Sequence, residues 1–191
     1  VHRLDKDTTG LLVVAKTLES HKSLVSQIQS KTIERQYCAL CVGVMTGGGT
    51  VNAKIGRHPK NRKKMSVLQK GGKPAVTHYR VTHRFKHFTK ISVSLETGRT
   101  HQIRVHMAHI GYPILGDRMY DGRASYVSGT SQKLIDMLHP FDRQALHAQR
   151  LTFRHPSDDR IVSYEALIPL DFKNLLILLK KEDSVNLGVS E

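Results

Sequence analysis

Apolar and polar residues alternate with a period of two in parts of this chain. Every second residue is apolar or aromatic in residues 79–85, and Ile91, Val93 and Leu95 alternate with polar residues further on. This period is typical of half-buried strands, so the two segments predict an antiparallel pair. The continuous apolar run in residues 11–16 predicts a buried strand.

A longer period indicates helices. Residues 18–30 form an amphipathic pattern that predicts a helix. Thr100 is expected to N-cap a helix over residues 101–110, which Gly111 ends. Strands and helices follow no regular βαβ order, which favours the α+β class. Further helices are predicted over residues 131–138 and 170–181, and further strands over residues 33–44, 51–55, 65–69, 146–154 and 161–167.

Net charge changes this picture most. Thirty Lys and Arg against sixteen Asp and Glu give +14 at pH 7. Such a balance indicates a polyanionic partner, most often nucleic acid, although a solvated basic face produces the same count. No run of residues is long and apolar enough to span a membrane.

One predicted loop, residues 57–64, concentrates this charge. It either grips phosphates or is simply solvated, and the overall charge favours contact with RNA. If its five cations all met phosphates of a flexible strand, the slope of log affinity against log salt would be about −3.5. These cations are Arg57, Lys60, Arg62, Lys63 and Lys64.

The two cysteines, Cys38 and Cys41, form a C-x-x-C pattern. They fall in the strand predicted over residues 33–44, where positions three apart point to opposite faces. No second pair is present to complete four metal ligands. We therefore expect neither a metal site nor a redox pair, and nothing indicates disulfides, in agreement with a reducing compartment.

Asp5 is the first candidate for chemistry. It follows Arg3 and Leu4 and leads into Gly10 and the apolar run. Burial is costly for an isolated carboxylate, but neighbouring cations can keep one ionised in a cleft. With Asp7 on an extended segment, the two carboxylates would lie about 6–7 Å apart, a spacing like that of a glycosidase pair. We favour a turn at Asp7, which leaves Asp5 as a lone catalytic carboxylate.

Residues 98–106 are dense in hydrogen-bond donors. At the start of the predicted helix, Arg99 and His101 would make an anion site. Arg104 lies deeper and suits a buried carboxylate, because its planar fork binds carboxylate bidentately. A surface helix with ordinary charges is the alternative. The histidines at positions 101, 106, 109 and 147 also invite a metal interpretation. A metal site is disfavoured, since no matching carboxylate stands at ligand spacing.

Several segments together resemble the RluA-type pseudouridine synthases. They are residues 2–10, residues 34–37 and residues 96–111, and the likeness extends from Val1 to about Leu170. The resemblance implies a mixed, mainly antiparallel sheet with flanking helices and a central catalytic cleft. It also implies cofactor-free isomerisation of a flipped-out uridine in RNA, with large-subunit ribosomal RNA as the expected partner.

The resemblance assigns roles to four residues. Asp5 matches the essential aspartate, and Arg104 matches the arginine that pairs with it. Tyr37 matches the tyrosine that packs at the uracil ring and can act as a base. Arg3 matches an arginine that can fill the gap left by the flipped base. The departures from the family pattern are small: Thr9 stands where Ser is common, and Asp121 where Gly is common.

Val1 is not a start methionine. The resemblance implies that the first part of the catalytic core is missing here, as is the S4-like RNA-binding module that family members often carry at the N-terminus. We expect residues 1–182 to form the catalytic domain without its N-terminal part and residues 183–191 to form a tail. A monomer in the cytoplasm is the expected state. An N-glycosidase and a non-catalytic RNA-binding module stay open as alternatives.

Overall fold

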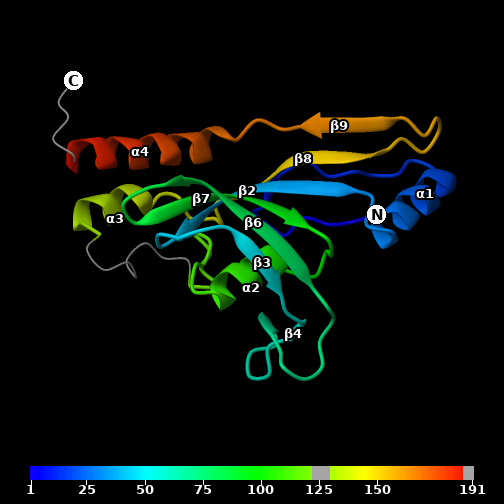
Figure 1. The fold of residues 1–191 in the computed structure, drawn as a ribbon. Coiled ribbons are helices and arrows are strands. Elements are labelled where there is room, and N and C mark those ends of the chain that lie inside the picture. The colour runs from blue at the N-terminus through cyan, green and yellow to red at the C-terminus, as the bar shows by residue number, and fades with distance from the viewer. Residues whose placement is uncertain (122–129, 187–191) are drawn as a thin grey trace.

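The computed structural model describes residues 1–121 and 130–186, and it shows one main sheet with helices on both sides (Figure 1). Within these residues, seven strands form this sheet in the order β1-β8-β2-β7-β6-β3, with β9 also paired to β8, while β4 and β5 form a separate hairpin. The strands are β1 (Thr9–Gly10), β2 (Glu34–Val42), β3 (Gly49–Asn52), β4 (Ile55–Arg57), β5 (Met65–Val67), β6 (Val76–Arg84), β7 (Phe88–Leu95), β8 (Leu146–Arg154) and β9 (Ile161–Glu165). The helices are α1 (Leu18–Gln29), α2 (Gln102–His109), α3 (Gln132–Leu138) and α4 (Leu170–Asn186).

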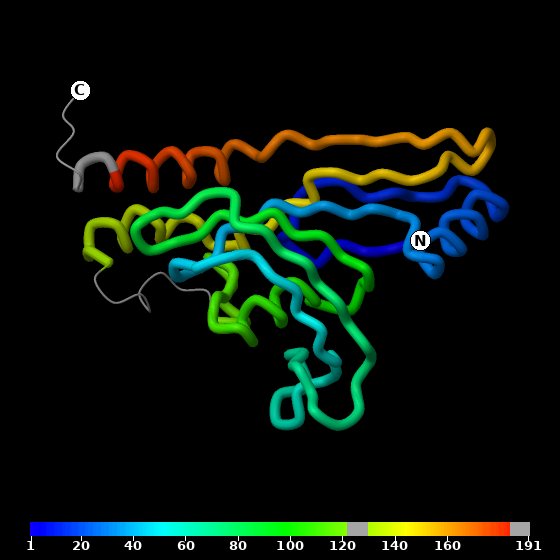
Figure 2. The backbone as a smooth tube through the Cα atoms, in the orientation of Figure 1, coloured from blue at the N-terminus to red at the C-terminus, as the bar shows by residue number. Residues whose placement is uncertain are grey.

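The α+β class and the mixed, mainly antiparallel sheet are confirmed. Central strand β2 pairs antiparallel with β7 and with β8, so that Tyr37 faces Val93 on one side and Ala148 on the other. Strand β1 pairs with β8 in parallel. Figure 2 shows the first segment of the chain running beside β8. Gly10, at φ 108°, permits this approach, because a Cβ there would collide with the carbonyl group of Ala148.

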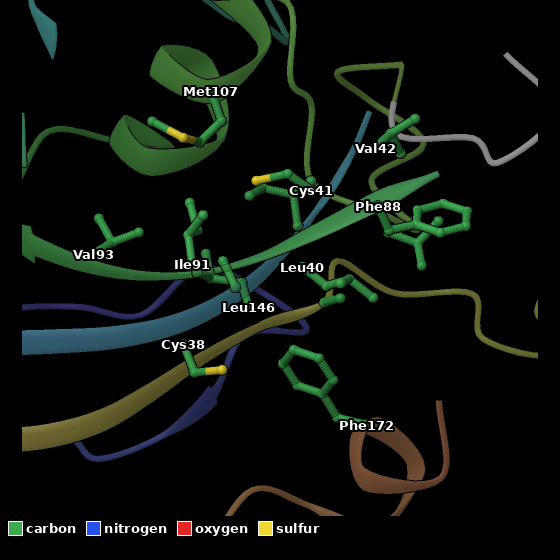
Figure 3. Close-up of a cluster of buried hydrophobic side chains, with 14 of the residues drawn as sticks. Cys38, Leu40, Cys41, Val42, Phe88, Ile91, Val93, Met107, Leu146 and Phe172 are labelled. Carbon is green, nitrogen blue, oxygen red and sulfur yellow. The ribbon is translucent and has the colours of Figure 1, made fainter. Parts of the chain in front are cut away.

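The core fills both faces of the sheet. Met107 of α2 packs on one face and Phe172 of α4 on the other, with Leu40 and Ile91 among the buried side chains of the strands (Figure 3). Alternate residues of a strand point to opposite faces, so the same strands can pack against helices on both sides of the sheet. The two faces together position the segments that carry the candidate chemistry.

Cys38 and Cys41 lie on opposite faces of β2, as the strand pattern predicts (Figure 3). Both thiols are free and buried. Burial raises the pKa of both, and this effect opposes thiolate formation.

Side-chain caps fix two of the helices. The Oγ1 of Thr17 accepts a hydrogen bond from the Ser20 amide at the start of α1, and Ser131 caps α3 in the same way through the Leu134 amide. Helix α4 extends to Asn186, beyond the end predicted at residue 181, so the helix passes the boundary expected at residue 182. Within residues 1–121 and 130–186, no helix is both long and apolar enough to cross a membrane.

The predicted strand over residues 11–16 is wrong. Only its first amide joins the sheet, where the Leu11 N–H donates to the Ala148 carbonyl at 2.9 Å. The segment instead packs Leu11, Val13 and Ala15 against the small apolar cluster around Leu24. Its apolar residues are therefore explained by side-chain burial without a strand partner among the described residues.

Two other predictions need correction. Thr100 is not the N-cap of α2, because the helix begins one residue later, with His101 as the N-cap in the left-handed conformation at φ 58°. The single strand predicted over residues 51–55 is two short strands, β3 and β4, separated at residues 53–54. The strand predicted over residues 146–154 has the same bounds as β8, and the remaining predicted strands differ from the observed ones only at their ends, by at most three residues.

Candidate active site

A pocket of about 490 Å³ opens beside the first residues of the chain. It is bounded by residues 1–8, the start of β2, the loop after β7 and the start of α2. The candidate residues that line it are Arg3, Asp5, Tyr37, Arg99 and His101. The pocket therefore brings together residues that are far apart in the sequence.

A tight turn positions Asp5. The Thr8 amide donates to the Asp5 carbonyl at 3.1 Å, and Asp7 occupies the left-handed region at φ 67°. Gln144, just before β8, stabilises this turn, since its Nε2 donates to the Lys6 carbonyl at 2.6 Å and to Thr8 Oγ1 at 3.0 Å. Asp7 is exposed and does not line the pocket. The favoured turn at Asp7 is confirmed, and among the described residues Asp5 is the one carboxylate that lines the pocket.

Arg104 joins Asp5 to a second carboxylate. Its Nη1 donates to Asp5 Oδ2 at 3.4 Å, while its Nε and Nη2 donate to Asp117 Oδ2 and Oδ1 at 2.6 and 2.9 Å. The Asp5 side chain is 14% exposed and that of Asp117 is 1% exposed. The pairing of Asp5 with Arg104 is present, but the shorter, bidentate contacts of the arginine go to Asp117.

Tyr37 lies on β2 and forms one wall of the pocket. Burial is the main reason that the pKa of its phenol is raised, and the nearby Asp5 carboxylate raises it further, against an opposing effect of Arg35. Tyr37 is therefore a protonated, largely apolar ring surface over most of the pH range. Such a surface suits stacking against a planar base.

His101 and Tyr120 form a pair next to this wall. The Tyr120 hydroxyl accepts a hydrogen bond from the Met65 amide at 2.9 Å and lies 2.8 Å from His101 Nδ1. Burial, followed by the charge of Arg104, lowers the pKa of His101, which favours the neutral ring. If the hydroxyl donates to Nδ1, a neutral His101 carries its proton on Nε2 and can donate that proton to a ligand.

The predicted RNA-contacting cations fall into two groups. Arg3, Arg99 and His101 line the pocket. The other five belong to residues 57–64, the last residue of β4 and its connection to β5, and none of these five lines the pocket. Figure 1 shows the β4–β5 region projecting from the main sheet. The guanidinium of Arg57 is partly engaged within this segment, since its Nη1 donates to the Arg62 carbonyl at 2.9 Å.

Comparisons with known proteins identify a family for this chain. The sequence model of the RNA pseudouridylate synthase family matches residues 1–109, which is more than half of the chain. This chain belongs to that family. The matched region contains Asp5, Tyr37 and Arg104.

Curated relatives within the pseudouridine synthases match over nearly the whole chain. "Ribosomal large subunit pseudouridine synthase D" of Pseudomonas aeruginosa is 53% identical over 188 residues, which cover 98% of this chain and 58% of that protein. The protein of the same name from Vibrio parahaemolyticus is 51% identical over 182 residues, covering 95% of this chain and 56% of the relative. The chain thus spans less than three fifths of the length of these relatives.

Solved structures of pseudouridylate synthase domains share the fold. Human RNA Pseudouridylate Synthase Domain Containing 4 superposes with a TM-score of 0.74 at 25% identity, over 94% of this chain and 74% of that one. Human RNA Pseudouridylate Synthase Domain Containing 1 gives a TM-score of 0.66 at 25% identity, over 93% and 78%. The resemblance seen in the sequence motifs is confirmed at the level of family and fold.

In this member of the pseudouridylate synthase family, sequence reasoning missed three residues at the site: Asp117, Tyr120 and Arg35. Asp117 and Tyr120 lie in the segment 116–120, where Gly116 at φ 77° reverses the chain. Arg35 stands two residues before Tyr37 on β2, and both line the pocket. A period of two along β2 would have placed Arg35 on the same face as Tyr37.

Two histidines that invited a metal interpretation have other partners. His106 is hydrogen-bonded through Nδ1 to Thr77 Oγ1 and through Nε2 to the Ala53 carbonyl. His147 is bonded to Thr9 Oγ1 and to the Ala166 carbonyl. Among residues 1–121 and 130–186, no group of three or more His, Cys, Asp or Glu side chains could hold a metal ion.

Proposed function

We propose that this chain isomerises uridines in RNA to pseudouridine, with Asp5 as the essential carboxylate. The observation that carries the proposal is the position of Asp5: it is held by Arg104 in the pocket that Tyr37 walls, within a chain of the pseudouridylate synthase family. The relatives' names point to large-subunit ribosomal RNA as the substrate.

The reaction needs no redox cofactor. The N1–C1′ bond of the uridine breaks, the ring rotates, and a C5–C1′ bond forms. C5 releases its proton and N1 gains one, so atoms and electrons balance within one nucleotide. Asp5 starts the cleavage as nucleophile or base, and Arg104 orients its carboxylate and stabilises its ionised form. Water must be kept out, because hydrolysis would otherwise compete.

The target base reaches Asp5 by leaving its stack, at a cost of a few kcal/mol. Tyr37 would then offer its ring to the uracil. Arg3, which is exposed and lines the pocket, would fill the gap in the RNA. Arg99 and His101 line the same pocket and would contact the nucleotide or its phosphates. The five cations of residues 57–64 would hold RNA outside the pocket. We propose that the enzyme works as a cytoplasmic monomer.

The decisive experiment measures tritium release from large-subunit ribosomal RNA transcribed with 5-³H-uridine. We expect wild-type protein to release tritium, and the Asp5→Ala variant to release none while its affinity for the RNA stays within a few fold. Asp7→Asn is the matched control, since its side chain is exposed, two residues away and outside the pocket. Its rate should equal that of the wild type.

Three other outcomes would count against the proposal. Release of free uracil by wild type would identify an N-glycosidase. RNA binding without any tritium release, also when the upstream sequence of a longer relative is added, would favour a binding module. A collapse of RNA affinity in Asp5→Ala would give Asp5 a structural role.

A further inference from the structure

Arg35 is a buried arginine that has no acidic partner among the residues that the structure describes. The residue is 7% exposed, and it stands on β2 on the same side as Tyr37, where both line the pocket. Within the described residues it forms no ion pair with any carboxylate, and its Nε has no hydrogen-bond partner. Its one hydrogen bond, from Nη2 to the Leu95 carbonyl, is 3.5 Å long.

A buried guanidinium in this condition is costly. Taking a cation out of water is unfavourable unless the charge is paired and its donors are satisfied. Burial accordingly lowers the pKa of Arg35, and together with burial the uncompensated charge of Arg35 lowers the pKa of His2. A buried donor without a partner calls for an explanation, and a ligand that supplies the missing charge and acceptors provides one.

The surroundings select an anion over a neutral acceptor. Among the described residues that line the pocket, the cations are Arg3, Arg35 and Arg99, whereas the one carboxylate is Asp5, which already pairs with Arg104. A carbonyl oxygen of the base would satisfy a donor but would leave the charge uncompensated. A phosphate does both, because the planar guanidinium fork binds two of its oxygens.

Gly98 leaves the space that the guanidinium occupies. A Cβ at this position would lie 2.7 Å from Arg35 Nη1. Any larger residue would therefore push the end of the arginine side chain. The loop after β7 thus contributes a position without a side chain where Arg35 needs room.

We propose that Arg35 binds a backbone phosphate next to the flipped nucleotide, as an anion site inside the pocket that is separate from the basic segment 57–64. The proposal rests on the proposed function for the identity of the RNA substrate. A phosphate held on the Tyr37 side would fix the backbone while the base turns toward Asp5.

The test measures RNA affinity over a range of salt concentrations in the Asp5→Ala background, so that no turnover is required. Arg35→Gln should weaken binding about tenfold, the value of one charge-assisted contact. It should also reduce the magnitude of the log affinity–log salt slope by about 0.7, since one counterion fewer is released. Arg35→Lys should keep the slope and lose part of the affinity. Gly98→Ala should weaken RNA binding in the same direction as Arg35→Gln but by less, because the added Cβ would displace the Arg35 guanidinium without removing it.

Arg84→Gln is the matched control. This exposed arginine donates to the Met45 and Thr46 carbonyls and does not line the pocket. Its removal should leave affinity and slope unchanged. Thermal unfolding of each variant separates loss of fold from loss of contact, and Arg35→Lys keeps the charge if Arg35→Gln does not fold.

A second measurement locates the phosphate. A single neutral methylphosphonate is placed at each linkage around the target uridine in turn. At one linkage the methylphosphonate should weaken RNA binding by the protein that retains Arg35. The same methylphosphonate should not weaken binding by the Arg35→Gln variant any further. Equal, additive losses at every linkage would overturn the proposal, as would an Arg35→Gln variant whose affinity falls with an unchanged salt slope. If wild type forms no pseudouridine, the salt slopes still decide the role of Arg35.

Discussion

Asp117 holds Arg104 through two hydrogen bonds, of 2.6 and 2.9 Å, and leaves the third guanidinium nitrogen facing Asp5 at 3.4 Å. The Asp117 carboxylate also accepts hydrogen bonds from the amides of Met119 and Tyr120 at 3.0 and 3.2 Å. A single arginine thus connects the candidate catalytic carboxylate with a buried one that the backbone fixes. We therefore expect Asp117 to act on Asp5 through Arg104, as a positioning residue.

Asp117→Asn should impair turnover more than binding. The amide cannot accept both Arg104 bonds, so the guanidinium loses its fixed orientation. A misplacement of about 1 Å can cost about 100-fold in rate, and we expect kcat to fall by 10- to 100-fold. RNA affinity should stay within a few fold. Tritium release at saturating RNA, with the dissociation constant measured separately, checks this.

Asp142→Asn is the matched control for that variant. Asp142 also accepts from an arginine, Arg118, but at 3.4 Å and with both side chains largely exposed. Exposed ion pairs contribute little, so kcat and stability should match the wild type. If both aspartate variants lowered kcat equally, the positioning role of Asp117 would be wrong.

Tyr120→Phe should separate the phenol's hydrogen bonds from its packing. The variant loses the bond with His101 and leaves the Met65 amide without its acceptor. We expect about 1–3 kcal/mol of lost stability from the unsatisfied amide, and about a fivefold lower kcat if the His101 bond is worth about 1 kcal/mol in the transition state. Urea unfolding and single-turnover rates measure the two effects.

The tautomer of His101 gives an independent signature of that pair. The ring ¹⁵N shifts of wild type should show a protonated Nε2 and an accepting Nδ1, and Tyr120→Phe should shift them toward a mixture. Tyr164→Phe is the control, because Tyr164 is exposed on β9. Unchanged His101 shifts in Tyr120→Phe would show that the phenol does not select the tautomer.

The connection between β4 and β5 should supply salt-dependent affinity without affecting chemistry. Lys60, Arg62 and Lys63 are exposed, whereas Arg57 already donates to a backbone carbonyl. Replacing the three exposed cations with Gln should reduce the magnitude of the log affinity–log salt slope by about 2, at about 0.7 per phosphate contact. The kcat at saturating RNA should not change.

A charge-matched control tests whether the position of these cations matters. Lys133 on α3 and Lys173 and Lys181 on α4 are exposed and lie on other elements. Their triple Gln variant carries the same net charge as the variant of the β4–β5 connection. If both variants changed the slope equally, the effect would come from net charge and the basic segment would have no special role.

Some of this structure could be predicted from the sequence, because a local period encodes it. Alternating side chains in residues 79–85 and 91–95 predicted β6 and β7, since one face of each strand had to be buried. The same logic failed for residues 11–16. An apolar run reports burial, but a strand also needs a partner backbone, and the run itself carries no information about that partner.

Some residues of the candidate site could likewise be predicted from the sequence, and others could not. Asp5, Tyr37 and Arg104 stand in motifs, and these motifs pointed to the pocket. Asp117 lies 13 residues after Arg104 across a turn, a separation with no helical or strand period. The missing partner of Arg35 is equally invisible in the sequence, because it depends on which carboxylates the fold brings near the start of β2.

His2 should make the first segment of the chain sensitive to acid. Burial, then the charge of Arg35, lowers the pKa of His2 from 6.5 to about 4, and its Nε2 accepts a hydrogen bond from the Val13 amide at 3.1 Å. Between these pH values the unfolded chain binds more protons than the folded one, so stability is complete above about pH 6.5 and falls as the pH drops toward about 4. His2→Gln keeps a hydrogen-bond acceptor that does not titrate. It should flatten the pH dependence of the free energy of unfolding and of Val13 amide exchange between about pH 4 and 6.5. His139→Gln is the control, because His139 is exposed at the C-cap of α3, and it should leave both quantities as in wild type. Acid loss of Val13 protection that persists in His2→Gln would assign the effect to another group.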